Sequence, residues 1–137
     1  MQDRPGREEL LQGIVRFLES DLVPVLEEPL RFHTRVAANL LRIIGRENVL
    51  EETQMRREAR ELRCLLGEPE PPGQGSAAGL REEVVRLNRE LCRRIRSGAA
   101  DSGPWHQDVL VLLRETVREK LEIANPAVIR ETAKERR

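Results

Sequence analysis

Apolar residues recur every three or four positions through most of this chain, and no stretch of useful length alternates apolar with polar residues. The first spacing places side chains on one face of an α-helix, whereas alternation is typical of a half-buried β-strand. Tyrosine is absent and aromatic residues make up only 2% of the sequence, which also disfavours strand-rich architectures. The pattern therefore predicts an all-α fold, a bundle of about five helices.

Prolines and glycines divide the periodic pattern into separate helices. The predicted helices run from about Pro5 to Leu22, from Pro29 to Ile44, from Glu51 to Leu66, from Leu80 to Arg96 and from Trp105 to Ala124. Pro24 should end the first helix, residues 45–48 should stop or bend the second, and Asn125 before Pro126 should end the fifth. A short terminal helix can follow Pro126.

The apolar stripes of these helices differ in width. They are broad on the first, second and fifth helices and narrow on the third, which is the most polar of the five. A broad stripe indicates a helix that buries much of its surface. We therefore expect the first, second, fourth and fifth helices to form the core, with the third more peripheral.

Residues 67–79, GEPEPPGQGSAAG, contain three prolines and four glycines. Such a composition cannot continue a helix and predicts a flexible loop. The alternative is a linker between two domains. Because neither flank is long enough to hold a convincing core alone, we expect a single helical domain over residues 1–137.

Charge and composition exclude several classes of protein. Lys+Arg and Asp+Glu both total 24, so the basic excess of most nucleic-acid-binding proteins is absent. No apolar run approaches the roughly 20 residues of a membrane span, and the N-terminus lacks the apolar stretch of a signal peptide. A reducing cytoplasm is the expected location. Cys64 and Cys92 are too few for a disulfide framework or a structural zinc site, and they are expected to be small core residues.

Four polar residues fall on or beside the apolar faces when the helices are drawn at about 100° per residue. They are His33, Asn39, Asn88 and Lys120. Together they are a candidate pocket for a small ligand. The alternatives are a hydrogen-bonded core or rim histidine, two asparagines that bond to each other or cap a chain end, and a lysine whose ammonium reaches solvent.

No catalytic residues can be assigned from motifs. The sequence contains no nucleophile elbow, no phosphate-cradling glycine loop and no histidine pair with metal-ligand spacing. We therefore expect no enzymatic activity, no metal and no cofactor. Self-association into a homo-oligomer is left open.

Trp105, the only tryptophan, is a candidate interface residue. Tryptophan buries a large area and is enriched among the residues that dominate binding energy. The alternative is that Trp105 covers one end of the protein's own helical bundle.

Three segments resemble one bacterial family of small helical proteins of unassigned function. They are FHTRVAANLLRIIGRE (32–47), LNRELCRRIRSG (87–98) and LRETVREKLEIANP (113–126), and the similarity covers nearly the whole chain except residues 67–79. Members of this family are typically encoded beside an aminoglycoside-phosphotransferase-like kinase and an acyl-CoA dehydrogenase.

Some such gene clusters break down hydroxyacyl-CoA, with the kinase-like protein adding a phosphate that the dehydrogenase-like protein removes. The resemblance therefore implies a non-catalytic accessory subunit that supports a phosphotransferase-like kinase, with the dehydrogenase-like protein as a further partner. The family offers no established catalytic residues to carry over. The runner-up interpretation is a small-ligand-binding helical bundle that uses the polar pocket.

Overall fold

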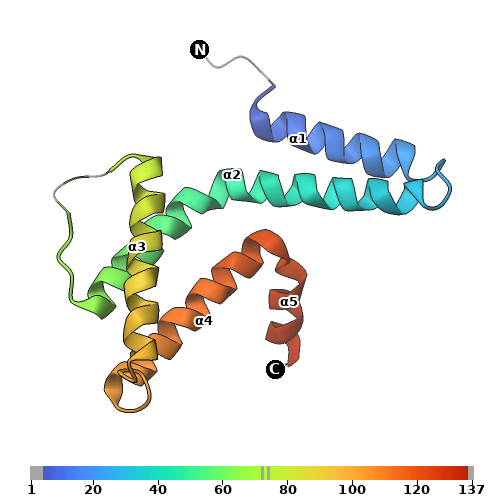
Figure 1. Ribbon diagram of the computed structural model, residues 1–137. Helices are drawn as coiled ribbons and strands as arrows, with labels where there is room; N and C mark the ends of the chain where they lie inside the picture. The colour runs from blue at the N-terminus through green and yellow to red at the C-terminus, as the bar shows by residue number, and fades with distance from the viewer. Residues whose placement is uncertain (1–4, 72, 74, 136–137) are drawn as a thin grey trace. The chain divides into compact units, whose positions relative to one another are not determined.

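The computed structural model describes residues 5–71, 73 and 75–135 (Figure 1). Its elements are α1 (Arg7–Arg16), a π-helical segment (Phe17–Leu22) that continues α1, α2 (Leu30–Leu66), α3 (Ala77–Arg96), α4 (Pro104–Ala124) and α5 (Pro126–Glu135). The described residues contain no strand. The predicted all-α fold is confirmed, and so are the breaks at Pro24 and at Asn125.

The second and third predicted helices are one continuous helix, α2, so the expected stop at residues 45–48 is wrong. A glycine inside a helix costs only about 1 kcal/mol relative to alanine, and no proline follows it here. Gly45 also lies close to α1, because a Cβ built on it would come within 4.0 Å of the Leu11 side chain. A side chain as small as alanine would make only an ordinary van der Waals contact there.

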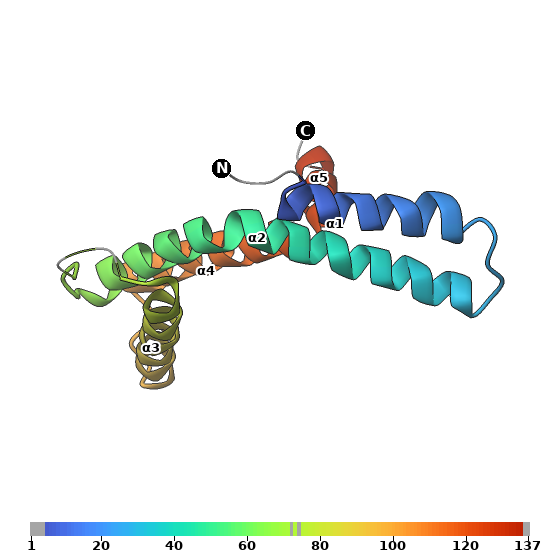
Figure 2. The ribbon, with the colours of Figure 1, turned by 90° about the horizontal axis from the view of Figure 1, so that it is seen from above.

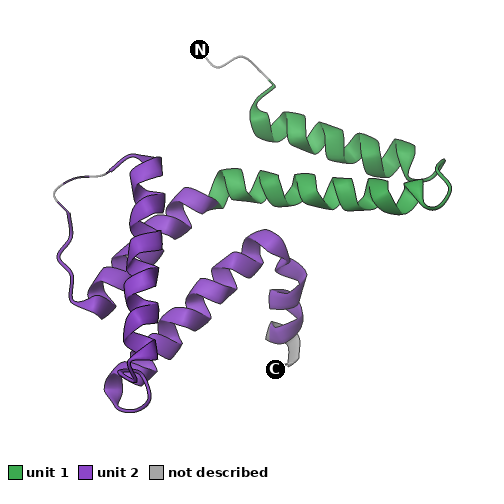
Figure 3. Ribbon diagram, in the orientation of Figure 1, with its two compact units in different colours: residues 1–50 green, residues 51–137 purple. Residues whose placement is uncertain are grey.

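The chain forms two compact units, residues 1–50 and residues 51–137, and the boundary falls inside α2 (Figure 3). Each unit is described by itself below as unit 1 or unit 2. The boundary does not coincide with the proline- and glycine-rich connection, which lies inside unit 2. The alternative that this connection separates two domains is therefore not favoured, and the expectation of a single cooperative domain stays a prediction.

Unit 1 is an antiparallel hairpin of α1, with its π-helical extension, and the first part of α2; the two lie side by side in both views (Figures 1 and 2). The backbone N–H of Phe32 donates to the Glu28 carboxylate at 3.2 Å, which satisfies one free donor in the first turn of α2. The only buried residues of this unit among those described are Val15 and Ala38. Unit 1 thus has very little core of its own.

Unit 2 contains the rest of α2 together with α3, α4 and α5. Its buried apolar residues form one cluster: Ala59, Leu62, Leu66, Leu80, Leu87, Leu91, Val109 and Leu112. On α2, Ala59, Leu62 and Leu66 are three or four residues apart, so they lie on one face of the helix. The small side chain of Ala59 lets another helix pack closely against it. This cluster is the main core of the described chain.

The expected assignment of helices to the core is therefore wrong in part. Residues 51–66, expected to be peripheral, supply Ala59, Leu62 and Leu66 to the central cluster. The first two predicted helices, expected to be central, bury only Val15 and Ala38 among their described residues. Stripe width reports how much surface a helix could bury, whereas neighbouring helices decide how much is covered.

The connection between α2 and α3 is shorter than predicted. The Ser76 hydroxyl accepts a hydrogen bond from the N–H of Gly79 at 3.2 Å and caps α3, which begins at Ala77. Residues 77–79, predicted as loop, are therefore helical. The flexibility of the remaining connection stays a prediction.

Candidate functional site

No catalytic or metal-binding cluster is found in the part of the chain that the structure describes. No group of three or more His, Cys, Asp or Glu side chains there could hold a metal ion. None of the described helices combines the length and apolarity that a bilayer span requires. The candidate sites are therefore surfaces and grooves, taken one unit at a time.

The most unusual surface is an apolar stripe on each helix of unit 1. We define the unit 1 stripe as these exposed large side chains at helical spacing: Leu10 and Ile14 on α1, Phe17 at the start of the π-helical segment, and Phe32, Val36, Leu40 and Ile44 on α2. Phe17 and Phe32 are the only phenylalanines of the chain, and they are 51% and 59% exposed. Contiguous exposed apolar surface of this kind is typical of interaction sites.

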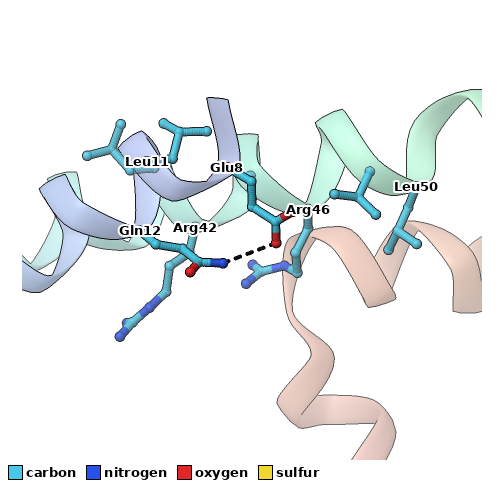
Figure 4. Close-up of a pocket in the computed structure, with 9 residues that line it drawn as sticks. Glu8, Leu11, Gln12, Arg42, Arg46 and Leu50 are labelled. Atoms are coloured by element: carbon cyan, nitrogen blue, oxygen red, sulfur yellow. Dashed lines mark hydrogen bonds between the residues drawn. The ribbon is translucent and has the colours of Figure 1, made fainter. Parts of the chain in front are cut away.

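A second feature of unit 1 is a hollow of about 340 Å³ in the seam between α1 and α2 (Figure 4). Leu11, Leu41 and Val49 are among its apolar lining residues. The polar groups at its rim pair within the unit, since Gln12 donates to Glu8 at 3.1 Å and Arg42 pairs with Glu19. The seam therefore offers an apolar recess without an arrangement of groups suited to catalysis.

His33 and Asn39, two of the four predicted pocket residues, lie in unit 1 and are exposed. The His33 ring packs edge-on near the Phe32 ring, with centroids 5.9 Å apart. Its ring contact with Phe32 places His33 beside an apolar residue of α2. The face itself is uncovered, so neither side chain is the buried polar group that the helical projection suggested.

Asn88 and Lys120, the other two predicted residues, lie in unit 2 and line one groove of about 590 Å³. The Asn88 amide donates to the Glu58 carboxylate at 2.8 Å and to the Val84 carbonyl at 3.1 Å. Glu58, which sequence reasoning missed, is buried. The structure thus brings together one pair of the predicted set and gives Asn88 a partner other than Asn39.

The groove also contains Cys92, which lies on the same wall as Asn88. Both cysteines, Cys64 and Cys92, are exposed free thiols. The expectation that they are small core residues is therefore wrong. Cysteine is often buried, but here the apolar stripe of each helix passes to one side of the thiol.

A charge cluster joins α2 to α4 elsewhere in unit 2. Arg57 on α2 lies 2.9 Å from Glu119, 3.7 Å from Glu115 and 3.5 Å from Glu61. Burial raises the pKa of Glu119 above its ordinary value, and the neighbouring Arg57 guanidinium opposes that rise. One arginine surrounded by three carboxylates is an interhelical contact that orients α4 on α2, and it supplies no catalytic geometry.

Trp105, the predicted interface residue, packs on the core of its own unit. Its ring is half-buried against the central cluster, and its indole N–H donates to the Leu65 carbonyl at 3.1 Å. Leu65 lies in the last turn of α2, where carbonyl groups lack intrahelical partners. Of the two alternatives raised by the sequence, these contacts favour the one in which Trp105 covers part of its own bundle.

We expect Trp105→Ala to lower the free energy of unfolding by about 2 kcal/mol, because it removes half-buried aromatic area and one hydrogen bond. Trp105→Phe should retain most of the packing and lose only about 1 kcal/mol, the usual value of one hydrogen bond. Urea denaturation followed by circular dichroism measures both. An unchanged midpoint for Trp105→Ala would show that the ring does not stabilise unit 2.

Comparisons with known proteins identify a family but no function. Neither the curated proteins nor the solved structures contain a significant match to this chain. One family model, described as "Domain of unknown function (DUF6285)", matches residues 24–128. The match spans α2, α3 and α4 completely and stops just inside α5, so it includes the groove of unit 2 and the α2 part of the unit 1 stripe. The chain therefore belongs to the DUF6285 family of domains of unknown function.

Proposed function

We propose that this protein is a non-catalytic accessory subunit that docks onto a phosphotransferase-like kinase through the unit 1 stripe. The kinase acts on a hydroxyacyl-CoA, and an acyl-CoA dehydrogenase-like protein is a second partner. The partners come from the resemblance of residues 32–47, 87–98 and 113–126 to proteins encoded beside such enzymes. The docking surface comes from the exposed apolar side chains of unit 1.

The single observation that supports docking is the imbalance between covered and uncovered apolar surface in unit 1. Val15 and Ala38 are buried, whereas the seven large side chains of the stripe are 42–59% exposed. Covering one half-exposed side chain of this size contributes about 1 kcal/mol. Seven together are sufficient to offset much of the entropic cost of association. A helical hairpin with so small a core is stabilised most by a partner that covers this stripe.

An accessory role also fits the chemistry that the chain lacks. Phosphoryl transfer needs groups that cradle phosphates, hold Mg²⁺ and orient the nucleophile. None of the corresponding motifs is present in the sequence. The kinase-like partner therefore supplies the reaction, and this chain contributes binding surface.

The test is to co-express the chain with the neighbouring kinase-like protein and to measure the affinity of the purified pair by isothermal titration calorimetry. The variant Phe32→Ala/Leu40→Ala should weaken binding by at least about 30-fold, which corresponds to about 2 kcal/mol for residues that dominate an interface. The purified chain alone should show no kinase, hydrolase or dehydrogenase turnover.

Arg35→Ala is the matched control, because Arg35 is exposed on the same helix but lies outside the stripe. It should change the affinity by less than about threefold, as surface substitutions usually do. The melting temperatures of both variants should stay near that of the parent protein. The proposal fails if the kinase-like protein does not bind, or if Phe32→Ala/Leu40→Ala binds as tightly as Arg35→Ala.

A further inference from the structure

The groove of unit 2 has one wall formed by a single face of α3. Its residues on that helix are Arg81, Val85, Asn88, Arg89, Cys92 and Arg96, with Val84 beside them. At about 100° per residue the first six fall within an arc of about 100°. The spacing between Arg89 and Arg96 corresponds to two helical turns, or about 10 Å along the axis. The guanidinium groups of Arg81, Arg89 and Arg96 thus line the groove along one face of α3.

The carboxylates of the groove are already engaged by neighbours within unit 2. Glu51 pairs with Arg81 at 2.6 Å, and Glu58 accepts a hydrogen bond from Asn88 at 2.8 Å. These pairs account for both acidic residues of the lining and for one of its cations. They join the α2 wall to the α3 wall. Asn88 is neutral, so Glu58 keeps its negative charge, and the four cations of the lining outnumber its two carboxylates.

Three cations of the lining are without a direct ion pair: Arg89 and Arg96 from α3, and Lys120 from α4. None of them forms an ion pair with any residue that the structure describes. By contrast, Arg86, Arg93 and Arg94 on the same helix all pair with carboxylates. Like charges that line one groove repel one another, and a bound anion with more than one charge relieves that repulsion.

The rest of the lining is apolar. Met55 of α2 and Val84 and Val85 of α3 contribute most of this surface, and Val85 is 44% exposed. A groove lined by cations beside exposed apolar side chains favours a ligand that has both characters. Inorganic phosphate would satisfy only the charges, and a neutral hydrocarbon would satisfy only the apolar part.

We infer that the groove between α2, α3 and α4 binds a phosphate monoester that carries an apolar group. Arg89, Arg96 and Lys120 bind the phosphate, and Met55, Val84 and Val85 contact the apolar part. Guanidinium groups suit this ligand because their paired N–H donors match phosphate oxygens. The inference goes beyond partner docking, because it concerns unit 2 and a small molecule.

The two exposed thiols provide an internal control for testing this inference on the intact protein. Cys92 lines the groove, whereas Cys64 is exposed on α2 outside it. The probe is 2-naphthyl phosphate, and the readout is the rate at which iodoacetamide alkylates each cysteine, followed by peptide mass spectrometry. The phosphate ester should slow alkylation of Cys92 several-fold and leave the rate at Cys64 unchanged. Equal rates with and without the probe at Cys92, or equal slowing at both cysteines, would overturn the inference.

A charge-matched control variant separates local binding from general attraction. Arg89→Gln and Arg96→Gln should each weaken binding of 2-naphthyl phosphate about tenfold, as expected for loss of one charge-assisted hydrogen bond. Arg93→Gln removes the same charge from the same helix, but Arg93 pairs with Glu90 outside the groove. Affinity should therefore change by less than about twofold in Arg93→Gln. Equal losses in all three variants would assign the binding to net charge and contradict the site.

Comparison ligands identify the source of the phosphate. 2-Naphthol and inorganic phosphate should both bind more weakly than 2-naphthyl phosphate, because each provides half of the contacts.

Phosphatidylcholine vesicles containing phosphatidic acid test whether a lipid supplies the monoester. Binding to these vesicles that is lost in Arg89→Gln/Arg96→Gln supports the same site with a lipid as ligand. Vesicle binding that persists in this variant, together with no binding of 2-naphthyl phosphate, contradicts the inference. No kinase-like partner is present in these assays, so their outcome is independent of the docking proposal.

Discussion

Leu87→Ala should lower the free energy of unfolding by about 3 kcal/mol, the middle of the range for a buried leucine. Leu87 is fully buried at the centre of the cluster formed by α2, α3 and α4. The loss combines the favourable free energy of burying the larger leucine side chain, which alanine lacks, with the cost of the cavity left in the variant. In a chain of this size the melting temperature should fall by about 10 °C. Chemical denaturation followed by circular dichroism measures the change.

Val85→Ala is the control for this prediction, because Val85 is 44% exposed on the same helix. Its stability should stay within about 0.5 kcal/mol of the parent, since alanine also has the higher helix propensity. A loss below about 1 kcal/mol for Leu87→Ala would contradict the core described here.

The denaturation curves of Leu87→Ala also test the single-domain prediction. If units 1 and 2 unfold separately, Leu87→Ala will shift one of two transitions and leave the other in place.

Arg63→Met should lower the free energy of unfolding by about 2 kcal/mol, because it removes one partner of a largely buried ion pair. The Arg63 side chain is only 9% exposed, and its Nε donates to the Glu83 carboxylate at 2.9 Å. This pair joins α2 to α3. Removing a fully buried partner costs about 3–5 kcal/mol. The smaller value is expected here because Glu83, which is 24% exposed, can be partly solvated after the arginine is lost.

Arg60→Met is the control, because Arg60 is exposed on the same helix and forms no ion pair with the described residues. Its stability should change by less than about 0.5 kcal/mol. In Arg63→Met/Glu83→Leu, where neither charge remains, we expect part of the lost stability to return. A double-mutant cycle from these variants measures the coupling directly. A coupling energy near zero would show that the contact does not hold α3 on α2.

The helical content and most helix ends could be predicted from the sequence because they depend on local chemistry. Pro24, Ser97 with Gly98, and Asn125 before Pro126 each end a helix within one or two residues of its observed boundary. Gly45 was the exception. A lone glycine weakens a helix without breaking it, and no proline follows Gly45 to end α2.

The candidate site was predicted less well, because helical projections identify faces but not what covers them. His33 and Asn39 lie on the predicted face of α2, which the structure leaves exposed. Asn88 and Lys120 do line one groove. Arg89 and Arg96, which add positive charge to the same groove, have no feature in the sequence that distinguishes them from other surface arginines. Their significance appears only when they are seen to line one groove with Lys120 and to form no ion pair with the described residues.

The sequence by itself determined that this chain is helical, because the period of its apolar residues and the positions of its prolines act over one or two turns. Only the tertiary structure decided which stripes become core. The narrow stripe with Ala59, Leu62 and Leu66 is enclosed by α3 and α4, whereas the broad stripe with Phe32 and Leu40 stays exposed. The physical reason is that burial is a property of pairs of surfaces. A helix carries the pattern of its own side chains, but the free energy of covering them depends on residues far away in the chain.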